Sequence, residues 1–337
     1  MAAGAAYTGR NMFMGVAIQS DVSTAGTVFE YFQPTDISGI IEEYDFKTSD
    51  KRVGTRFKAP GRKSAKKVPF SFTVELTPDC GRLLFLMTGA DDLTVVVAGE
   101  VGSHEFTFEE VLPYFTLVVD SAGVADVTGP GKSHRVTGCK VGSWSIKGSV
   151  DGATLLLTIT GEGMARDEIT TPTPSYGTAL PFILHADEAY GTISLGASIG
   201  AVAQFDECIE LSLEGDNGIS ADRRINGSGT PVGMREGDSS MKGSFKAIYN
   251  EETWAEIDIF QAGTDRSMVV EVKHDASFHL TNEKTLTLSA DKTRYSGTPT
   301  AFDPDVISTS LSFDIENTAS LTLTLINEKV VAYSASA

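Results

Sequence analysis

Apolar and polar residues alternate through residues 68–76, VPFSFTVEL, near the middle of the first half of the chain. An alternation with a period of two is typical of a strand with one buried face. The next residues, 77–87, read TPDCGRLLFLM and have the composition of a short helix that ends at Gly89. This part of the sequence therefore predicts one long strand followed directly by a buried helix.

The same order of elements returns in the second half. The segment MKGSFKAIY at residues 241–249 alternates in the same way, and NEETWAEIDIF at residues 250–260 then leads to Gly263. Val68 and Met241 are 173 residues apart, and the helical segments keep this offset. An element order that recurs in phase predicts a tandem duplication of one β-rich unit.

Each half also ends in a predicted hairpin. The first spans residues 144–159 and turns at residues 151–152, and the second spans residues 311–325 and turns at residues 317–318. Short strands separated by glycine-rich turns favour a sandwich or a barrel. We therefore expect a mainly β protein of two tandem β-sandwich or half-barrel domains, each with one short flanking helix and a long interstrand loop.

The expected first domain covers residues 1–166, residues 167–181 form a linker, and the second domain covers residues 182–337. The linker is assigned from its charges and paired prolines, which favour an extended connection. A long loop lies at the same place in each domain, at residues 48–67 and residues 215–240. Long loops in compact domains often contact a partner, so we expect intermolecular contacts there, with a mobile surface flap as the alternative.

The charge is unevenly distributed along the chain. There are 27 basic and 45 acidic residues, which gives a net charge of −18. A protein this acidic repels phosphate backbones, which argues against nucleic-acid binding as its main task. One segment is nevertheless strongly basic, because it contains a single acid, Asp50, and nine basic residues: Lys47, Lys51, Arg52, Arg56, Lys58, Arg62, Lys63, Lys66 and Lys67.

The composition also indicates in which cellular compartment the protein acts. No apolar run approaches the ~18 to 20 residues that cross a bilayer, and the first ten residues lack the features of a secretion signal. We therefore expect the protein to act, or at least assemble, where it is made, without a membrane. The three cysteines, Cys80, Cys139 and Cys208, are widely spaced and odd in number, which predicts buried reduced thiols.

Four short patterns resemble chemical motifs. Residues 129–133, GPGKS, match the end of a phosphate-binding loop, but the residues that follow do not have a helical pattern. Residues 196–200, GASIG, match a nucleophile elbow at Ser198, but a strand follows where a helix is required. His274 and His279 are spaced for opposite faces of a strand, and residues 216–218 predict a tight turn. We expect no catalytic, cofactor or metal site.

The sequence resembles the tail tube proteins of long-tailed, non-contractile bacteriophages (siphoviruses), in the subgroup with two tandem tube domains. The resemblance covers nearly the whole chain and is carried by element order and loop position. Its segments are residues 61–67 before the first alternating strand, residues 175–182, residues 209–217, residues 224–229 and residues 235–245.

The resemblance implies a structural virion protein that is not an enzyme. Trimeric rings with pseudo-sixfold symmetry would stack into a hollow tube, assembled in the host cytoplasm, and the genome would pass through without specific binding. The implied partners are other copies of the chain, the tail tip and tail terminator proteins, and a tape measure protein inside the tube. The nine basic residues would form a loop that contacts the next ring.

Three alternatives belong to other classes. An extracellular β-sandwich module for carbohydrate binding or adhesion would need a secretion signal and exposed aromatic residues, whereas Trp144 and Trp254 lie in a predicted core hairpin and core helix. A tube protein of a secretion system would form a single-domain hexamer. A hydrolase using Ser198 would react with serine-directed probes.

Overall fold

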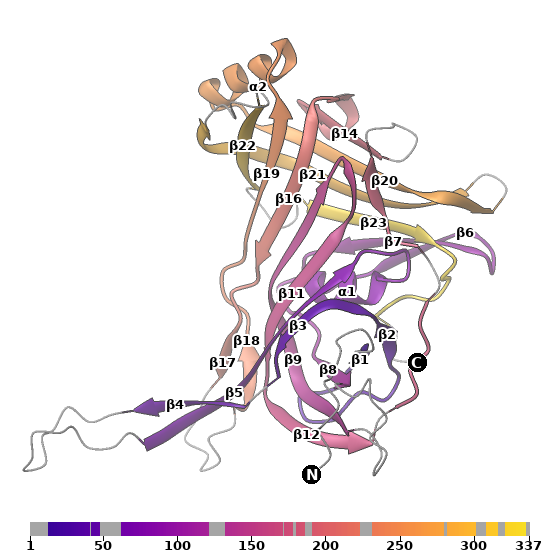
Figure 1. The fold of residues 1–337 in the computed structure, drawn as a ribbon, viewed down its shortest axis with the longest axis vertical. Coiled ribbons are helices and arrows are strands. Elements are labelled where there is room, and N and C mark those ends of the chain that lie inside the picture. Colours follow the sequence, from indigo (N-terminus) through magenta and orange to yellow (C-terminus); the bar gives the residue numbers. More distant parts are fainter. Residues whose placement is uncertain are drawn as a thin grey trace, which may run out of the picture.

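The computed structural model describes residues 13–40, 42–47, 62–120, 132–170, 172–177, 180–185, 191–222, 231–279, 282–300, 308–315 and 321–334. These residues form 23 β-strands and two α-helices, so the fold is mainly β, as the sequence predicts. Figure 1 shows a tall, twisted sheet with α2 at its upper end, a rounded group of strands at its lower end, and an arm that extends sideways from the lower end.

The strands of the first half surround one long strand, β9. β8 and β12 flank its N-terminal part, and β11 pairs with its C-terminal part. β1 pairs with β2 and β8, and β5 lies between β11 and β3. The strand bounds are β1 (Phe13–Ile18), β2 (Glu30–Phe32), β3 (Pro34–Gly39), β4 (Glu43–Lys47), β5 (Arg62–Glu75), β6 (Asp92–Val97), β7 (Val101–Thr107), β8 (Phe115–Asp120), β9 (Lys132–Ser149), β10 (Asp151–Thr154), β11 (Leu156–Gly163) and β12 (Ala165–Thr170).

The second half surrounds the long strand β21 in the same way. β20 and β23 flank its N-terminal part, and β22 pairs with its C-terminal part. β14 pairs with β15 and β20, and β19 lies between β22 and β16. The bounds are β13 (Ile183–His185), β14 (Gly191–Gly196), β15 (Val202–Gln204), β16 (Cys208–Asp216), β17 (Ser220–Asp222), β18 (Gly233–Arg235), β19 (Ser240–Ile248), β20 (Arg266–His279), β21 (Asn282–Thr300), β22 (Ser308–Ile315) and β23 (Leu321–Asn327).

The two halves therefore repeat one pairing scheme. Eight strands of the first half have counterparts in the second, in this order: β1 and β14, β2 and β15, β3 and β16, β5 and β19, β8 and β20, β9 and β21, β11 and β22, β12 and β23. The first half adds the hairpin of β6 and β7 between its helix and β8. β12 includes residues 167–170 of the predicted linker and pairs with β9. The domain bounds given above stay a prediction.

The predicted hairpin at residues 311–325 was wrong in its pairing. Both of its strands exist, as β22 and β23, but each pairs with β21. Leu311 pairs with Phe245 of β19, and Leu323 pairs with Leu288 of β21. The counterpart of the hairpin of β9 and β11 is therefore the hairpin of β21 and β22. Polar and apolar residues alternate over residues 310–315 of β22 and 321–325 of β23, so their pattern was compatible with either partner.

The helices α1 (Gly81–Thr88) and α2 (Glu251–Ala262) follow β5 and β19. Each ends at the predicted glycine in the left-handed conformation, with φ of 102° at Gly89 and 64° at Gly263. Every residue of α1 is buried, whereas only three of the twelve residues of α2 are. Trp254 of α2 is 49% exposed, so its predicted place in the core was wrong. α2 contacts β21 along one side only, where Glu256 accepts a hydrogen bond from Tyr295.

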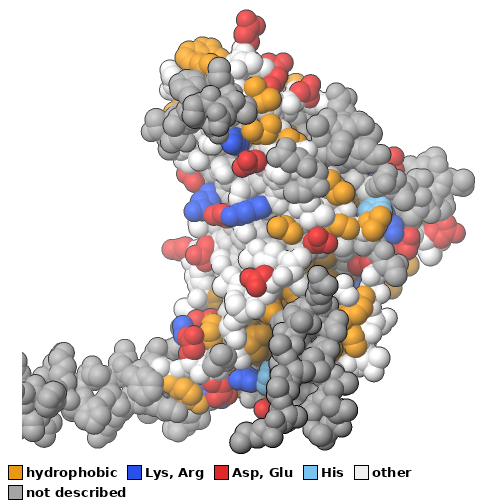
Figure 2. Space-filling view, in the orientation of Figure 1, with side chains coloured by type: hydrophobic (Ala, Val, Ile, Leu, Met, Phe, Trp, Pro, Cys, Tyr) orange, Lys and Arg blue, Asp and Glu red, His pale blue; other side chains and the backbone are white. Residues whose placement is uncertain are grey.

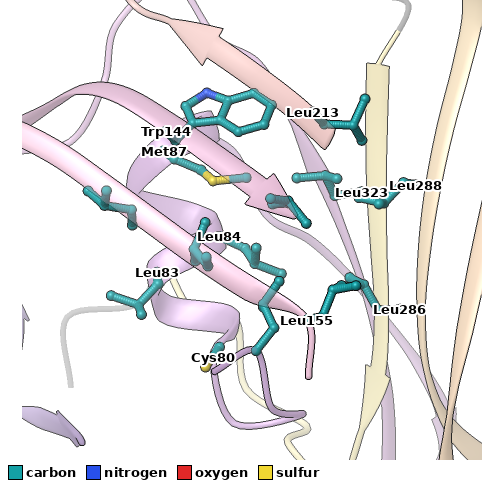
Figure 3. Packing of buried hydrophobic residues seen from close by; sticks show 14 of the residues in the cluster. Cys80, Leu83, Leu84, Met87, Trp144, Leu155, Leu213, Leu286, Leu288 and Leu323 are labelled. Atoms are coloured by element: carbon teal, nitrogen blue, oxygen red, sulfur yellow. The ribbon is translucent and has the colours of Figure 1, made fainter. Parts of the chain in front are cut away.

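A first joint between the halves is formed by β9 and β16. Seven consecutive residue pairs run from Ser143 with Asp216 to Ser149 with Glu210. Beneath this joint, apolar side chains of both halves pack into one core around α1, and Figure 3 shows Leu84, Trp144 and Leu155 of the first half beside Leu213 and Leu286 of the second. Gly215 lies against the indole of Trp144, where a side chain would overlap the ring.

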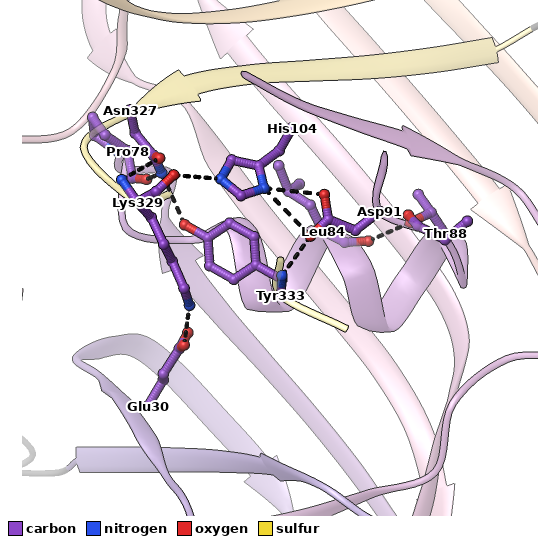
Figure 4. Close-up of polar contacts among 10 residues, drawn as sticks. Glu30, Pro78, Leu84, Thr88, Asp91, His104, Asn327, Lys329 and Tyr333 are labelled. Carbon is purple, nitrogen blue, oxygen red and sulfur yellow. Dashed lines mark hydrogen bonds and ion pairs between the residues drawn. The ribbon is translucent and has the colours of Figure 1, made fainter. Parts of the chain in front are cut away.

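A second joint lies at the C-terminal end of the chain. β23 pairs with β7 of the first half, and the segment after β23 folds over the start of α1. Figure 4 shows the polar contacts that fix this segment. His104 joins Asp91 at 3.0 Å and the carbonyl oxygen of Lys329 at 2.9 Å, and the backbone N–H of Tyr333 donates to Asp91. Asn327 donates to the carbonyl oxygen of Pro78 at 2.7 Å and to Tyr333 Oη at 2.8 Å.

Candidate assembly surfaces

One face of the central sheet is open and runs without interruption across both halves. The strand order across it is β3, β5, β11, β9, β16, β19, β22 and β21. Residues opposite each other on neighbouring strands share a face. One such row comprises Glu75, Leu156, Lys147, Ser212, Ser244, Ser312 and Ser296, and the next comprises Asp36, Thr73, Thr158, Ser145, Glu214, Lys242, Asp314 and Arg294.

Short hydroxyl side chains dominate this surface, which we call the hydroxyl face. Some of them bond to one another across strands, as do Ser71 with Thr160 at 3.1 Å and Thr73 with Thr158 at 2.9 Å. The face arises because serine and threonine alternate with large apolar residues along each strand, and the apolar set forms the core. Its hydroxyl residues include Ser71, Thr73, Ser143, Ser145, Ser149, Thr158, Thr160, Ser212, Ser244, Ser296, Ser310 and Ser312.

The three lysines of the hydroxyl face are paired with carboxylates of the same face. Lys147 Nζ lies 3.1 Å from Glu214, Lys242 Nζ lies 3.6 Å from the same carboxylate, and Lys246 Nζ lies 3.8 Å from Glu210. The hydrogen bond from Lys147 lowers the pKa of Glu214. In Figure 2, basic and acidic side chains lie next to each other across the middle of the molecule. The surface thus carries both signs of charge in close alternation.

Both long loops of the sequence contain paired strands. The loop at residues 48–67 is part of an arm in which β4 pairs with the start of β5, from Glu43 with Lys67 to Lys47 with Arg62. This arm extends away from the body in Figure 1. The loop at residues 215–240 contains the hairpin of β17 and β18. The two loops lie at equivalent places, between β3 and β5 and between β16 and β19.

The basic residues of the arm fall into two groups by position. The strands at its base and stem carry the residues nearest the body, and its tip lies outside the described residues. Lys47, Arg62, Lys63, Lys66 and Lys67 lie on β4 and β5, whereas Lys51, Arg52, Arg56 and Lys58 lie outside the described residues.

Two of these cations have partners within the chain. Lys66 forms an ion pair with Glu42, and this hydrogen bond lowers the pKa of Glu42. Lys67 Nζ lies 3.6 Å from Glu43 and 3.7 Å from Glu162. The charges of Lys66 and Lys67 are therefore balanced at the base of the arm.

The candidate chemical motifs that lie within the described residues have structural roles. Ser198 precedes a single 3-10 turn, Ile199–Ala201, between the paired strands β14 and β15, so the turn lacks the helix of a nucleophile elbow. Residues 129–131 lie outside the described residues, and β9 begins at Lys132. Among the described residues, no group of three or more potential metal ligands gathers. The exposed Trp254 meets Tyr249 at an interplanar angle of 80°, so the two rings do not form a flat platform.

Asn217 is a structural residue that the sequence did not identify. It was part of a predicted tight turn, and Asp216 does accept a hydrogen bond from the N–H of Gly218 at 2.8 Å. Asn217 itself is buried and donates to the carbonyl oxygens of Met87 and Val141, at 3.3 and 3.2 Å. It therefore links the end of β16 to α1 and β9 of the first half. No local sequence signal indicates a contact over this separation.

Comparison with known proteins identifies the family. A family model described as phage tail tube protein matches residues 9–315. No curated protein matches the chain. None of the helices within the described residues has the length and apolar character needed to cross a membrane.

Proposed function

The chain belongs to the phage tail tube protein family, and on this premise we propose that it forms trimeric rings that stack into the hollow tube of a virion tail. Two similar halves per chain would give such a ring pseudo-sixfold symmetry. The tube would be assembled in the host cytoplasm, enclose a tape measure protein, end at tail tip and tail terminator proteins, and conduct the genome into the host.

The continuous hydroxyl face is the observation that carries this proposal. In a closed ring one face of the central sheet lines the bore, and the other face is covered in each half by a helix and its own strands. Short hydroxyl side chains and lysines paired with carboxylates leave no row of free cations among the described residues of this face. DNA phosphates would therefore find few fixed binding partners along the bore.

The repeated pairing scheme supports a tandem arrangement of two tube domains. We propose that they occupy residues 1–166 and 182–337, joined by residues 167–181. The joint between β9 and β16 makes the two domains one continuous sheet, so each chain would contribute a third of the ring wall.

The bore assignment predicts a pattern of thiol protection. In assembled tubes, a cysteine that replaces Ser145 on the hydroxyl face should react with a small maleimide and resist one attached to a large polymer. In unassembled chains it should react with both. Labelling is measured by mass spectrometry. The three native thiols should not react with maleimide near neutral pH. Burial raises the pKa of Cys80 to about 11 and that of Cys208 to about 12, and it also raises the pKa of Cys139.

The matched control replaces Val96 of β6, which is 49% exposed and does not lie on the hydroxyl face. Its cysteine should accept the large reagent in tubes as it does in unassembled chains. Equal reactivity of the cysteine at position 145 toward the large reagent in tubes and in unassembled chains would show that the hydroxyl face does not line the bore.

We propose that the basic arm contacts an acidic surface of the next ring and fixes the polarity of stacking. Replacing Arg52, Arg56, Arg62 and Lys63 by glutamine should shorten the tubes while trimeric rings still form, because a charge contact between rings is lost. Tube length is measured by electron microscopy and ring formation by solution mass. A control that neutralises four other basic residues, Lys147, Lys242, Lys246 and Lys273, should leave tube length closer to that of the parent. Tubes of normal length from the arm variant would contradict this role.

A further inference from the structure

The joint between β9 and β16 provides a template for a joint between chains. Along β9, Cys139 is the last residue that pairs with β8, and Ser143 is the first that pairs with β16. The C-terminal part of β9 thus has β11 on one side and β16 of the second half on the other. By the repeated pairing scheme, the counterparts of β9 and β16 are β21 and β3.

β3 has one open edge. It pairs with β5 on one side, and on the other side no described strand lies against it, whereas β16 has neighbours on both sides. Thr35, Asp36, Ser38 and Gly39 are accordingly exposed. The N–H of Ile40 donates to Pro69 of β5 at 2.7 Å. At this end of β3, Gly39 and Ile40 have positive φ values of 85° and 59°, so the regular strand conformation stops there.

β21 has the complementary open edge. Thr293 is its last residue that pairs with β20, and the strand continues to Thr300 with β22 on one side. Within the described part of the chain, the opposite side of residues 294–300 has no partner strand. Pro299 lies within this segment and has no backbone N–H to donate.

We propose that β3 of one copy pairs, antiparallel, with the C-terminal segment of β21 of the next copy, as β16 pairs with β9 inside the chain. The occupant of each edge is a second copy, because the two edges are the counterparts of strands that already pair in this way. The interface is heterologous, so its repetition closes a ring when the rotation from copy to copy leads back to the first copy. It would also extend the hydroxyl face from chain to chain, since Ser38 lies opposite Ser71 of that face. This inference rests on the proposed ring.

Photo-crosslinking between copies tests the joint. Ser38 is replaced by p-benzoyl-phenylalanine in the full chain, and chains with natural and with heavy nitrogen are mixed before assembly. After irradiation, cross-linked peptides that combine both isotopes report contacts between copies. The position 38 probe should give its main mixed-isotope cross-link to the C-terminal segment of β21, between positions 294 and 300. The same probe at Val96, on the separate exposed strand β6, should lack this cross-link.

The possible outcomes distinguish a failure of the proposed strand pairing from a failure of the proposed tube function. If rings or tubes form and the position 38 probe cross-links only to other segments, the joint is wrong and the tube function stands. If the unmodified chain forms neither rings nor tubes, the proposed function fails and the joint fails with it. Should the probe at Ser38 prevent assembly, the probe at Asp36, which is also exposed on β3, must give the same cross-link.

Discussion

Replacing Tyr333 with alanine is expected to lower the free energy of unfolding by about 4 kcal/mol, the range of buried aromatic truncations. Tyr333 is 2% exposed. The centre of its ring lies 4.6 Å from the centre of the His104 ring and 3.7 Å from Lys329 Nζ. It also rests on Gly81, at the start of α1, where any side chain would overlap it. Removing it therefore opens a cavity between the C-terminal segment and the first half. Urea denaturation followed by tryptophan fluorescence measures the loss.

The matched control is Tyr333→Phe, which keeps the ring and removes the hydroxyl group. It should cost only about 1 kcal/mol, because Asn327 Nδ2 still has the carbonyl oxygen of Pro78 as its acceptor. Equal and small losses for both variants would mean that the C-terminal segment does not help to hold the two halves together.

Replacing Gly215 with valine should destabilise the protein by about 3 kcal/mol, the upper end of the usual cost of overpacking. Gly215 lies on β16 directly over the indole of Trp144, and even a Cβ atom would overlap the ring. Trp144 is 3% exposed and cannot move outward without breaking its stacking on Phe108, at 5.6 Å between ring centres. The strain falls on the joint between β9 and β16. Unfolding in urea again gives the change.

Gly191→Val is the control for this substitution. Gly191 also lies in a strand, β14, but a Cβ there would have its nearest neighbour at 3.4 Å, so valine should be tolerated. Adding Trp144→Leu to Gly215→Val should recover part of the loss, because the smaller side chain makes room. A double variant no more stable than Gly215→Val alone would show that the strain lies elsewhere.

The two strand and helix pairs, β5 with α1 and β19 with α2, were predicted well because their signals are local. Alternation placed β5 and β19, and glycine, which tolerates the left-handed conformation, marked the ends of both helices at Gly89 and Gly263. The failures concern contacts distant in sequence. Whether β23 pairs with β22 or with β21 depends on the whole sheet, and Trp254 is exposed because α2 has the sheet on one side only.

The assembly surfaces were predicted in part. The basic arm was visible as a run of charge, but the pairing of Lys66 with Glu42 depends on a register between β4 and β5 that composition does not encode. Single strands such as β9 show the alternation of Ser143 and Ser145 with buried Trp144 and Ile146. That these hydroxyl groups join those of β19 into one face required the joint with β16, which no local pattern indicates.

Imaging the purified protein tests the central claim most directly. Electron microscopy at high concentration, alongside the mass in solution, should show hollow tubes of uniform width or rings with a mass of three chains of 35.9 kDa each. Averaged cross-sections of the tubes should place the hydroxyl face on the inner wall. Particles that remain single, compact chains at every concentration, even when a tail tip complex is supplied to start assembly, would contradict the account.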